Sequence, residues 1–372
     1  MEVQIAQELG FTVDIITGTG PKNQKLISEG LPGVNYWRFP SLTKYIYPFK
    51  DLRALRDLYI FFRKKKYHIV HTHLAKAGVI GRLAAGMAKI PVIIHDVHGP
   101  SFSTAHSWIK RCIFINLERL AGKVTTTIVF YTDHLRKLYE SQGIGKRAEK
   151  KVIYPALRLR SFLEASPLPA TERNRLRSQW QLAPDHLVIG YAARIVPSKG
   201  HHFAIEALPY LLDRWPKVRL LLVGGAIWQE EAAQLKRLKR LVANLNLEGK
   251  VIFTGHQSHM IPFYQIFDLY VLPSLYEGPA NTMLEAISMG LPVVAFDIPT
   301  VRELGHPQII RCPIADVQGL SQALSCCLEK LETAPENLRP SLSFRQELAE
   351  KFSYHRWKGN ISDLYLSSLA YL

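Results

Sequence analysis

The chain of 372 residues has little that would mark a secreted or membrane-spanning protein. Its four cysteines include one adjacent pair, Cys326 and Cys327, but no Cys-x-x-Cys motif and no disulfide framework, which favours a reducing cytoplasm. No apolar run approaches the roughly 20 residues that a transmembrane helix needs. No internal repeat or low-complexity segment occurs. We therefore expect a cytoplasmic globular protein, and the length predicts two domains.

Acidic residues are scarce relative to basic ones: Lys and Arg number 47 and Asp and Glu 31, which gives a formal net charge of +16. This excess favours anionic partners, either nucleotide phosphates or an acidic membrane surface, although it also serves ordinary solubility. Basic and aromatic residues alternate from Tyr36 to Tyr67. That region fits the surface of an anionic membrane, or a core helix over 51–65 with Leu52, Leu55, Leu58 and Phe62 facing inward. Nucleic acid is not expected, because no recognised binding module accompanies the charge.

One stretch of the second half places two carboxylates on a strand–turn–helix unit. An apolar run over 269–273 predicts a buried strand, and a helix is expected to begin near Asn281. Glu277 then lies at the carboxyl end of the strand, where open α/β sheets bind ligands, and Glu285 lies in the first turns of the helix. The free backbone N–H groups from Asn281 to Leu284, Thr282 included, suit an anion such as phosphate. The alternative is a capping loop with a solvated helix carboxylate.

A second strand–loop–helix unit begins at 187–191, and its loop contains Arg194 and Lys199. Two cations fixed at a strand end would offset the charge of a departing diphosphate, although a basic surface loop is the alternative. A further strand is predicted over 251–255 and ends at Gly255, which His256 follows.

The first half is rich in histidine. Five histidines fall within 31 residues, among them His71 and His73 on one face of a predicted strand and His98 after the next strand. Such a group suggests zinc, but we find no neighbouring cysteine or carboxylate that completes a ligand set. We therefore predict no metal site, and His98 has either a functional role or a hydrogen-bonding role in its loop.

These motifs together resemble a known family. The string from Glu277 to Val294 resembles the Glu-(seven residues)-Glu motif of retaining GT-B glycosyltransferases of the group 1 or family 4 type, which include capsule and exopolysaccharide enzymes. The loop from Arg194 to Gly200 and the run from Val70 to Gly99 resemble the same family. The resemblance implies an α/β fold of two doubly wound, Rossmann-like domains that face each other across a cleft. It implies an acceptor-side domain over 1–160, a nucleotide-sugar domain over 161–351 and a terminal helix over 352–372 that crosses back to the first domain.

The resemblance also implies a function: transfer of a sugar, with retention at the anomeric carbon, from a nucleotide-diphosphate sugar to a hydroxyl acceptor. Arg194 and Lys199 would grip the diphosphate, Glu285 the ribose, and Glu277 and His98 the reacting sugar. The remaining nucleotide-binding residues would be Gly255, His256, Asn281 and Thr282. The donor is the only small molecule implied, with no cofactor, and the lack of an Asp-x-Asp sequence favours metal independence. The acceptor would be a lipid-linked glycan, reached by peripheral association with the inner face of the membrane.

The start of the chain departs from the family pattern. Residues 1–9 have helical spacing, whereas a doubly wound domain normally begins with a strand and a Gly-rich loop. We therefore expect such a strand and loop upstream of Met1 in a competent form. The alternatives are a non-catalytic or truncated nucleotide-sugar-binding protein, or a GT-B nucleotide-sugar epimerase, which the Glu-(seven residues)-Glu string disfavours.

Overall fold

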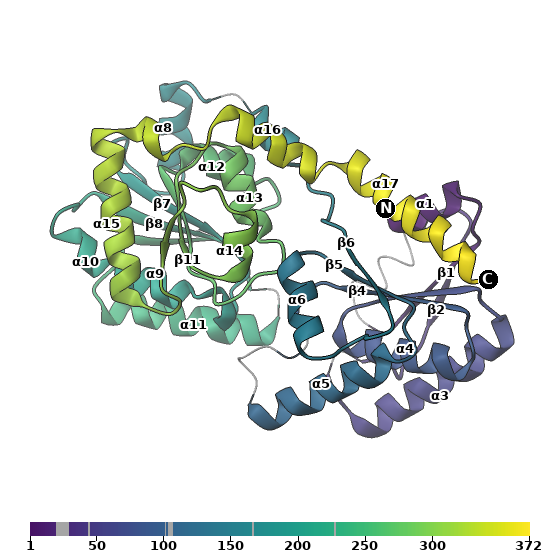
Figure 1. The fold of residues 1–372 in the computed structure, drawn as a ribbon. Coiled ribbons are helices and arrows are strands. Elements are labelled where there is room, and N and C mark those ends of the chain that lie inside the picture. Colours follow the sequence, from purple (N-terminus) through teal and green to yellow (C-terminus); the bar gives the residue numbers. More distant parts are fainter. Residues whose placement is uncertain (20–29, 44, 101, 103–106, 166, 227) are drawn as a thin grey trace. The chain divides into compact units, whose positions relative to one another are not determined.

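The computed structural model describes residues 1–19, 30–43, 45–100, 102, 107–165, 167–226 and 228–372. The chain forms two compact units, of which unit 1 contains Met1–Pro155 and Tyr354–Leu372 and unit 2 contains Ala156–Ser353 (Figure 1). In both units, parallel strands alternate with helices along the chain. The predicted class, α/β with two doubly wound, Rossmann-like units, is therefore confirmed.

Unit 2 is built on a six-stranded parallel sheet in the order β12-β11-β10-β7-β8-β9. The chain adds β8 and β9 on one side of β7, and then returns to place β10 on the other side. Because helices cover both faces of the sheet, its central strands are continuous apolar runs, and the residues of β10 are all buried. The strands are β7 (Leu187–Ala192), β8 (Val218–Val223), β9 (Val251–Gly255), β10 (Leu269–Leu272), β11 (Val293–Phe296) and β12 (Ile310–Cys312).

The helices of unit 2 follow the strands in the order that the sequence predicts. The longest are α11, which lies between β8 and β9, and α15, which follows β12. The helices are α7 (Leu159–Leu163), α8 (Ala170–Ser178), α9 (His201–Ala207), α10 (Pro209–Leu212), α11 (Gln229–Asn244), α12 (Ile261–Ile266), α13 (Asn281–Ser288), α14 (Pro299–Leu304), α15 (Val317–Thr333) and α16 (Leu342–Lys351). Short 3-10 turns occur at Pro197–Lys199 and Pro335–Leu338.

Unit 1 has two parallel sheets instead of one, with strand orders β1-β2 and β3-β4-β5-β6. Among the described residues, β1 and β3 each pair with a single strand. A strand and Gly-rich loop upstream of Met1 stay a prediction. The strands are β1 (Val13–Thr17), β2 (Val34–Arg38), β3 (Ile69–His73), β4 (Val92–Val97), β5 (Thr127–Phe130) and β6 (Glu149–Val152).

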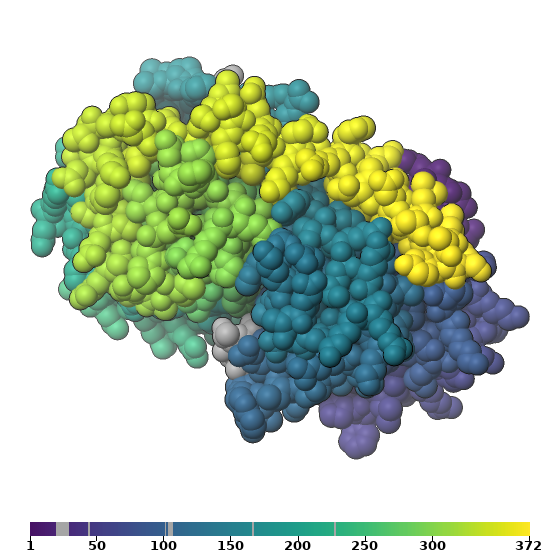
Figure 2. All heavy atoms as spheres, viewed as in Figure 1, coloured from purple at the N-terminus to yellow at the C-terminus, as the bar shows by residue number. Residues whose placement is uncertain are grey.

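The helices of unit 1 come from both ends of the chain. On one side of the strands lie α3 (Pro48–Lys65), α4 (Ala75–Met87) and α5 (Trp108–Gly122), while α1 (Glu2–Glu8) packs against α17 (Tyr354–Ser368) on the other (Figure 1). The space-filling view shows the C-terminal residues in yellow lying against the purple N-terminal residues (Figure 2). An ion pair of 2.6 Å between Lys358 and Glu8 joins the two helices. Helix α6 (Asp133–Ser141) precedes β6, and a 3-10 turn at Leu369–Tyr371 follows α17.

The basic and aromatic region is divided between core and surface. Trp37, Phe61 and Tyr67 pack in an aromatic cluster, and Leu58 lies in the core. Leu52 is 66% exposed, so its predicted inward position is wrong, whereas Leu58 and Phe62 are buried on the inner face of α3 as predicted, together with Ala54. Lys44 lies outside the described residues. In the described part of the chain, no helix is long and apolar enough to cross a membrane.

Candidate active site

The loops after β7 and β10 form the centre of the candidate site in unit 2. These two strands are neighbours, but β8 lies on the far side of β7 and β11 on the far side of β10, so the strand order reverses between them. Open α/β sheets bind ligands at such a switch point, outside the carboxyl ends of the strands. Arg194 and Lys199 follow β7, and Glu277, Asn281 and Glu285 follow β10. The fold therefore gathers these predicted site residues around one edge of the sheet.

The loop after β7 has a closely fixed backbone. Gly200 has a positive φ of 65°, and a Cβ there would lie 1.9 Å from the carbonyl oxygen of Pro273, so only glycine fits. The backbone N–H of Leu275 donates to the carbonyl oxygen of Ser198 at 2.9 Å, which ties the two loops together. The hydroxyl of Tyr191 donates to the carbonyl oxygen of Lys199 at 2.6 Å. These contacts fix the position of the Lys199 backbone, from which its side chain extends.

Both predicted diphosphate-binding cations face a carboxylate. Lys199 Nζ lies 2.5 Å from Glu277 Oε2, and these side chains are 21% and 11% exposed. Arg194 Nη1 lies 3.3 Å from Oε1 of Glu231, and the Arg194 side chain is 65% exposed. Glu231 also accepts a hydrogen bond from the backbone N–H of Trp228 at the start of α11. Sequence reasoning missed Glu231, although two acidic residues in the first turn of a helix are a recognisable signal.

The first turns of α13 hold the remaining polar groups. Glu285 accepts a hydrogen bond of 2.7 Å from the Tyr264 hydroxyl; burial raises the pKa of its carboxyl, and that hydrogen bond opposes the rise. The Thr282 hydroxyl accepts a hydrogen bond of 2.8 Å from Tyr270. The prediction that N–H groups up to Leu284 are open to an anion is wrong for two of them, because those of Met283 and Leu284 donate to Ala280. The N–H groups of Asn281 and Thr282 have no partner among the described residues.

The third part of the site lies at the ends of β8 and β9. Gly255 ends β9 with a φ of 73°, and His256 is exposed beside it. Gly224, at the end of β8, has its backbone N–H bonded to the Gly255 carbonyl oxygen at 3.0 Å. A Cβ on Gly224 would lie 1.8 Å from the carbonyl oxygen of Ala193, which precedes Arg194. Sequence reasoning passed over Gly224 and Gly225, although a Gly-Gly pair at a strand end signals close backbone approach.

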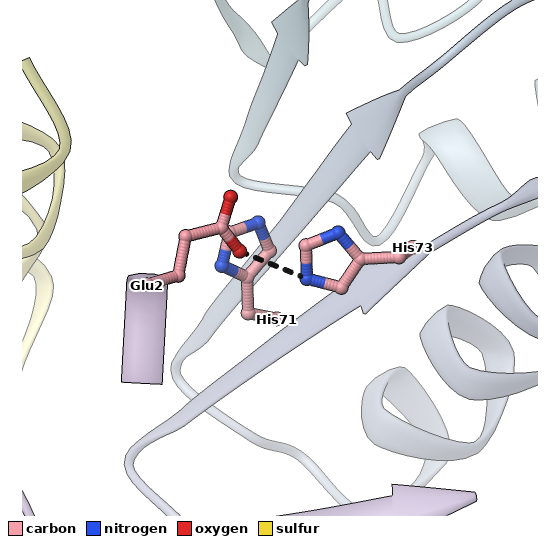
Figure 3. A group of neighbouring side chains, drawn as sticks. All are labelled: Glu2, His71 and His73. Atoms are coloured by element: carbon pink, nitrogen blue, oxygen red, sulfur yellow. Dashed lines mark ion pairs between the residues drawn. The ribbon is translucent and has the colours of Figure 1, made fainter. Parts of the chain in front are cut away.

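A separate cluster of polar side chains lies in unit 1 at the carboxyl ends of β3 and β4. Asp96, on β4, is completely buried and lies 2.7 Å from Nε2 of His71 and 3.7 Å from Nδ1 of His73. His98 approaches His73 to 3.4 Å, between Nε2 and Nδ1. Glu2 Oε2 lies 3.4 Å from Nε2 of His73 (Figure 3).

The protonation of this cluster follows from the buried Asp96. Burial alone would raise the pKa of Asp96 and lower that of His71, but their mutual attraction reverses both effects. Burial and the charge on His71 lower the pKa of His73 to about 4. His98 is exposed at its rim, yet partial desolvation lowers its pKa as well. At neutral pH the cluster thus contains an ionised Asp96 carboxylate, which favours the charged form of His71, beside neutral imidazoles on His73 and His98.

The cluster also corrects the prediction about ligand sets. Asp96 and Glu2 supply the carboxylates that the sequence search did not find. His73, Asp96 and His98 offer three ligand atoms within 4.8 Å of one another, as do Glu2, His71 and His73. Two neutral imidazoles and one ionised carboxylate are a donor set that divalent transition metals accept. The unit therefore has groups that could hold such an ion, although the sequence predicted none.

Comparison with known proteins decides the family. The model of "Glycosyl transferases group 1" matches residues 172–332, and that of "Glycosyl transferase 4-like domain" matches residues 3–156. Each match falls on one of the two α/β units. The chain belongs to the group 1 glycosyltransferases.

Curated relatives of this glycosyltransferase chain include enzymes of surface polysaccharides. It is 29% identical over 262 residues, 70% of its length, to the UDP-Gal:alpha-D-GlcNAc-diphosphoundecaprenol alpha-1,3-galactosyltransferase of Escherichia coli. It is 27% identical over 251 residues, 67% of its length, to the capsular polysaccharide biosynthesis glycosyltransferase CapM of Staphylococcus aureus. The chain spans 65% and 64% of the lengths of these two relatives.

Solved structures share the fold of this glycosyltransferase. The sucrose-phosphate synthase of Thermosynechococcus elongatus aligns with a TM-score of 0.78 at 21% identity, covering 99% of this chain and 92% of the other. Anabaena Alr3699/HepE in complex with UDP-glucose aligns with a TM-score of 0.74 at 22% identity, covering 95% and 91%.

Proposed function

We propose that this chain is a retaining glycosyltransferase that moves a sugar from a nucleotide-diphosphate sugar to a hydroxyl of a lipid-linked glycan in polysaccharide biosynthesis. The arrangement at the switch point of unit 2 carries the proposal. There the loop after β7 contains Arg194 and Lys199. The neighbouring loop after β10 contains Glu277 and leads to the start of α13. Relatives support the substrates: one is crystallised with UDP-glucose, and another bears the name of a lipid-diphosphate acceptor.

The proposed chemistry needs a site that holds a dianionic leaving group. When the bond between the anomeric carbon and the diphosphate breaks, negative charge develops on the leaving oxygen, the acceptor oxygen bonds to the anomeric carbon, and the proton of the acceptor hydroxyl passes to the departing diphosphate. Lys199 and Arg194 would offset that charge, and the N–H groups of Asn281 and Thr282 would face the same anion. Arrival of the diphosphate would draw Lys199 away from Glu277 and free that carboxylate for a sugar hydroxyl. Neither a cofactor nor a metal is required by these steps.

The other predicted residues take supporting roles. Glu285 would accept hydrogen bonds from the ribose hydroxyls, since Tyr264 already fixes one of its oxygens. Gly255 and His256 would approach the base. His98, neutral at pH 7, would contact the transferred sugar without adding charge. We propose that the reaction takes place on the cytoplasmic side, with the chain held peripherally at the membrane.

The test has two stages. A thermal-shift screen against UDP, GDP, ADP and their sugars identifies the donor, because a ligand at 100 times its Kd stabilises the folded state by about 2.7 kcal/mol. Labelled donor is then incubated with polyprenyl-diphosphate-linked sugars, and the anomeric configuration of the product is determined by NMR. No thermal shift with any nucleotide would refute the proposal. A shift without release of nucleoside diphosphate would favour a binding protein, and a new sugar epimer would favour an epimerase.

A further inference from the structure

Helix α5 of unit 1 has one face that is firmly buried. Ile115 and Ala121 lie in the core, and Glu118 is completely buried with its carboxylate 2.6 Å from the guanidinium of Arg82 on α4. Arg82 also donates to the carbonyl oxygen of Gly78 at 3.0 Å. A buried charge pair is expensive to break, so the helix cannot easily rotate about its axis. The direction of its opposite face is therefore fixed by the fold.

That opposite face is apolar and uncovered. Ile109, Ile113, Leu117 and Leu120 are 61%, 51%, 40% and 48% exposed, and their spacing of four, four and three residues aligns them in one stripe. Trp108 extends the stripe at the first residue of the helix and is 77% exposed. The stripe lines a shallow groove of about 460 Å³. Contiguous apolar surface of this kind marks an interaction site more often than single exposed side chains do.

A strongly basic hollow adjoins the C-terminal end of the stripe. It has a volume of about 800 Å³ and is lined by Arg119, Lys123, Lys146 and Arg147 together with Gly143 and other residues without acidic groups. Arg119 donates to the carbonyl oxygen of Gln142, which also lines the hollow. Lys123, Lys146 and Arg147 are exposed. The hollow therefore presents cations that remain available to an external anion.

We propose that the α5 stripe and the basic hollow dock unit 1 on an anionic lipid bilayer. A bilayer provides an apolar layer and an anionic layer within a few ångströms of each other. Its acyl chains would contact Trp108 and the aliphatic residues, and its lipid phosphates would contact the cations. A second copy of this chain fits less well, because each copy carries a net charge of +16 and would bring like charges together. Helix α3, on the same side of the strands, exposes Phe49 and Leu52 and forms the competing surface.

The docking surface does not depend on sugar transfer, although it would bring the site to a lipid-linked acceptor. Flotation of the full chain with vesicles of phosphatidylcholine, with and without 30% phosphatidylglycerol, tests it directly. We expect binding only with the anionic vesicles, weakened as salt rises from 50 to 500 mM. Lys123→Gln with Lys146→Gln should weaken binding about 30-fold, at about fivefold for each cation. Ile113→Ser with Leu117→Ser should weaken it at least tenfold.

Matched controls make the result specific. Lys236→Gln with Lys239→Gln removes the same charge from the exposed face of α11 in unit 2 and should leave binding unchanged. Phe49→Ser with Lys50→Gln tests α3. Retention of the nucleotide-induced thermal shift in every variant separates this outcome from failure of the proposed function. The proposal is overturned if the native chain does not float, or if the α3 variant loses binding while both α5 variants keep it.

Discussion

Replacement of Lys199 by alanine should affect both turnover and stability, whereas replacement of Arg194 should affect turnover alone. Each substitution removes one of the two cations that we propose offset the charge of the leaving diphosphate. Loss of one such donor typically lowers the rate by about 10²–10³, equivalent to about 2.7–4 kcal/mol in the transition state. Because the two side chains differ in exposure, 21% against 65%, only Lys199→Ala removes a shielded ion pair.

The stability difference follows from what each substitution leaves behind. Lys199→Ala leaves the Glu277 carboxylate, 11% exposed, without its cation, which should lower the free energy of unfolding by about 1–3 kcal/mol. For a unit of this size that lowers the Tm by about 2–4 °C per kcal/mol. Arg194→Ala removes an exposed pair that water screens, so its Tm should change little. Adding Glu277→Gln to Lys199→Ala should restore part of the Tm but not the turnover.

Initial rates of nucleoside diphosphate release and thermal melts of the same preparations measure both effects. Lys217→Ala is the matched control, because Lys217 pairs with Asp185 on the exposed surface of the same unit and should tolerate the change. Near-normal rates in both the Lys199 and Arg194 variants would refute the proposal that these two residues bind the diphosphate. An equal fall in Tm for the two variants would contradict the reasoning from exposure.

Three further outcomes are expected. Glu285→Gln should weaken binding of the free nucleoside diphosphate, measured by calorimetry, because a carboxylate bonded to ribose hydroxyls is lost; unchanged affinity would remove that role. Turnover should survive a chelator that leaves no transition metal in the protein by elemental analysis, and full loss restored by added Mg²⁺, Mn²⁺ or Zn²⁺ would refute metal independence. The folded-state pKa of His73, about 4, lies below its unfolded value near 6.5, so its contribution to stability is present above pH 6.5 and is lost as pH falls toward 4. His73→Asn should therefore show a smaller loss of unfolding free energy between pH 6.5 and 4 than the native chain, as measured by urea titration, and identical pH profiles would contradict the assignment.

The sequence predicted the fold class and the grouping of the candidate residues of unit 2 at one edge of the sheet, because both depend on short-range patterns. The cations and carboxylates follow apolar runs, and strand ends of a parallel sheet converge at one edge. The partners Glu231 and Tyr264 were not predicted, because each reaches the site from a helix that is distant in sequence from the residue it contacts. The separation of unit 1 into two sheets depends on strand pairing, which the pattern of a single segment does not determine. Whether the predicted residues perform their proposed roles is a matter for the variants above.

Two of the sequence predictions for unit 1 were wrong. Leu52 was placed inside from its helical spacing, but the choice of inner face depends on which neighbours a helix meets, and α3 meets α4 through Ala54, Leu58 and Phe62. Asp96 was overlooked as a partner for the histidines because it lies on a different strand from His71 and only the register of β3 with β4 brings them together.

The placement of α17 has a consequence for how the polypeptide matures during synthesis. The hydroxyl of Tyr365 lies 2.9 Å from Nδ1 of His71, across a sequence separation of 294 residues. A ribosome releases the N-terminal strands long before Tyr365 exists, and unit 2 is complete before α17 is made. The histidine cluster therefore stays incomplete until the last segment of the chain has been synthesised. Translation that stops within unit 2 would leave His71 on β3 without its final partner, so unit 1 is completed after unit 2 although most of unit 1 is synthesised first.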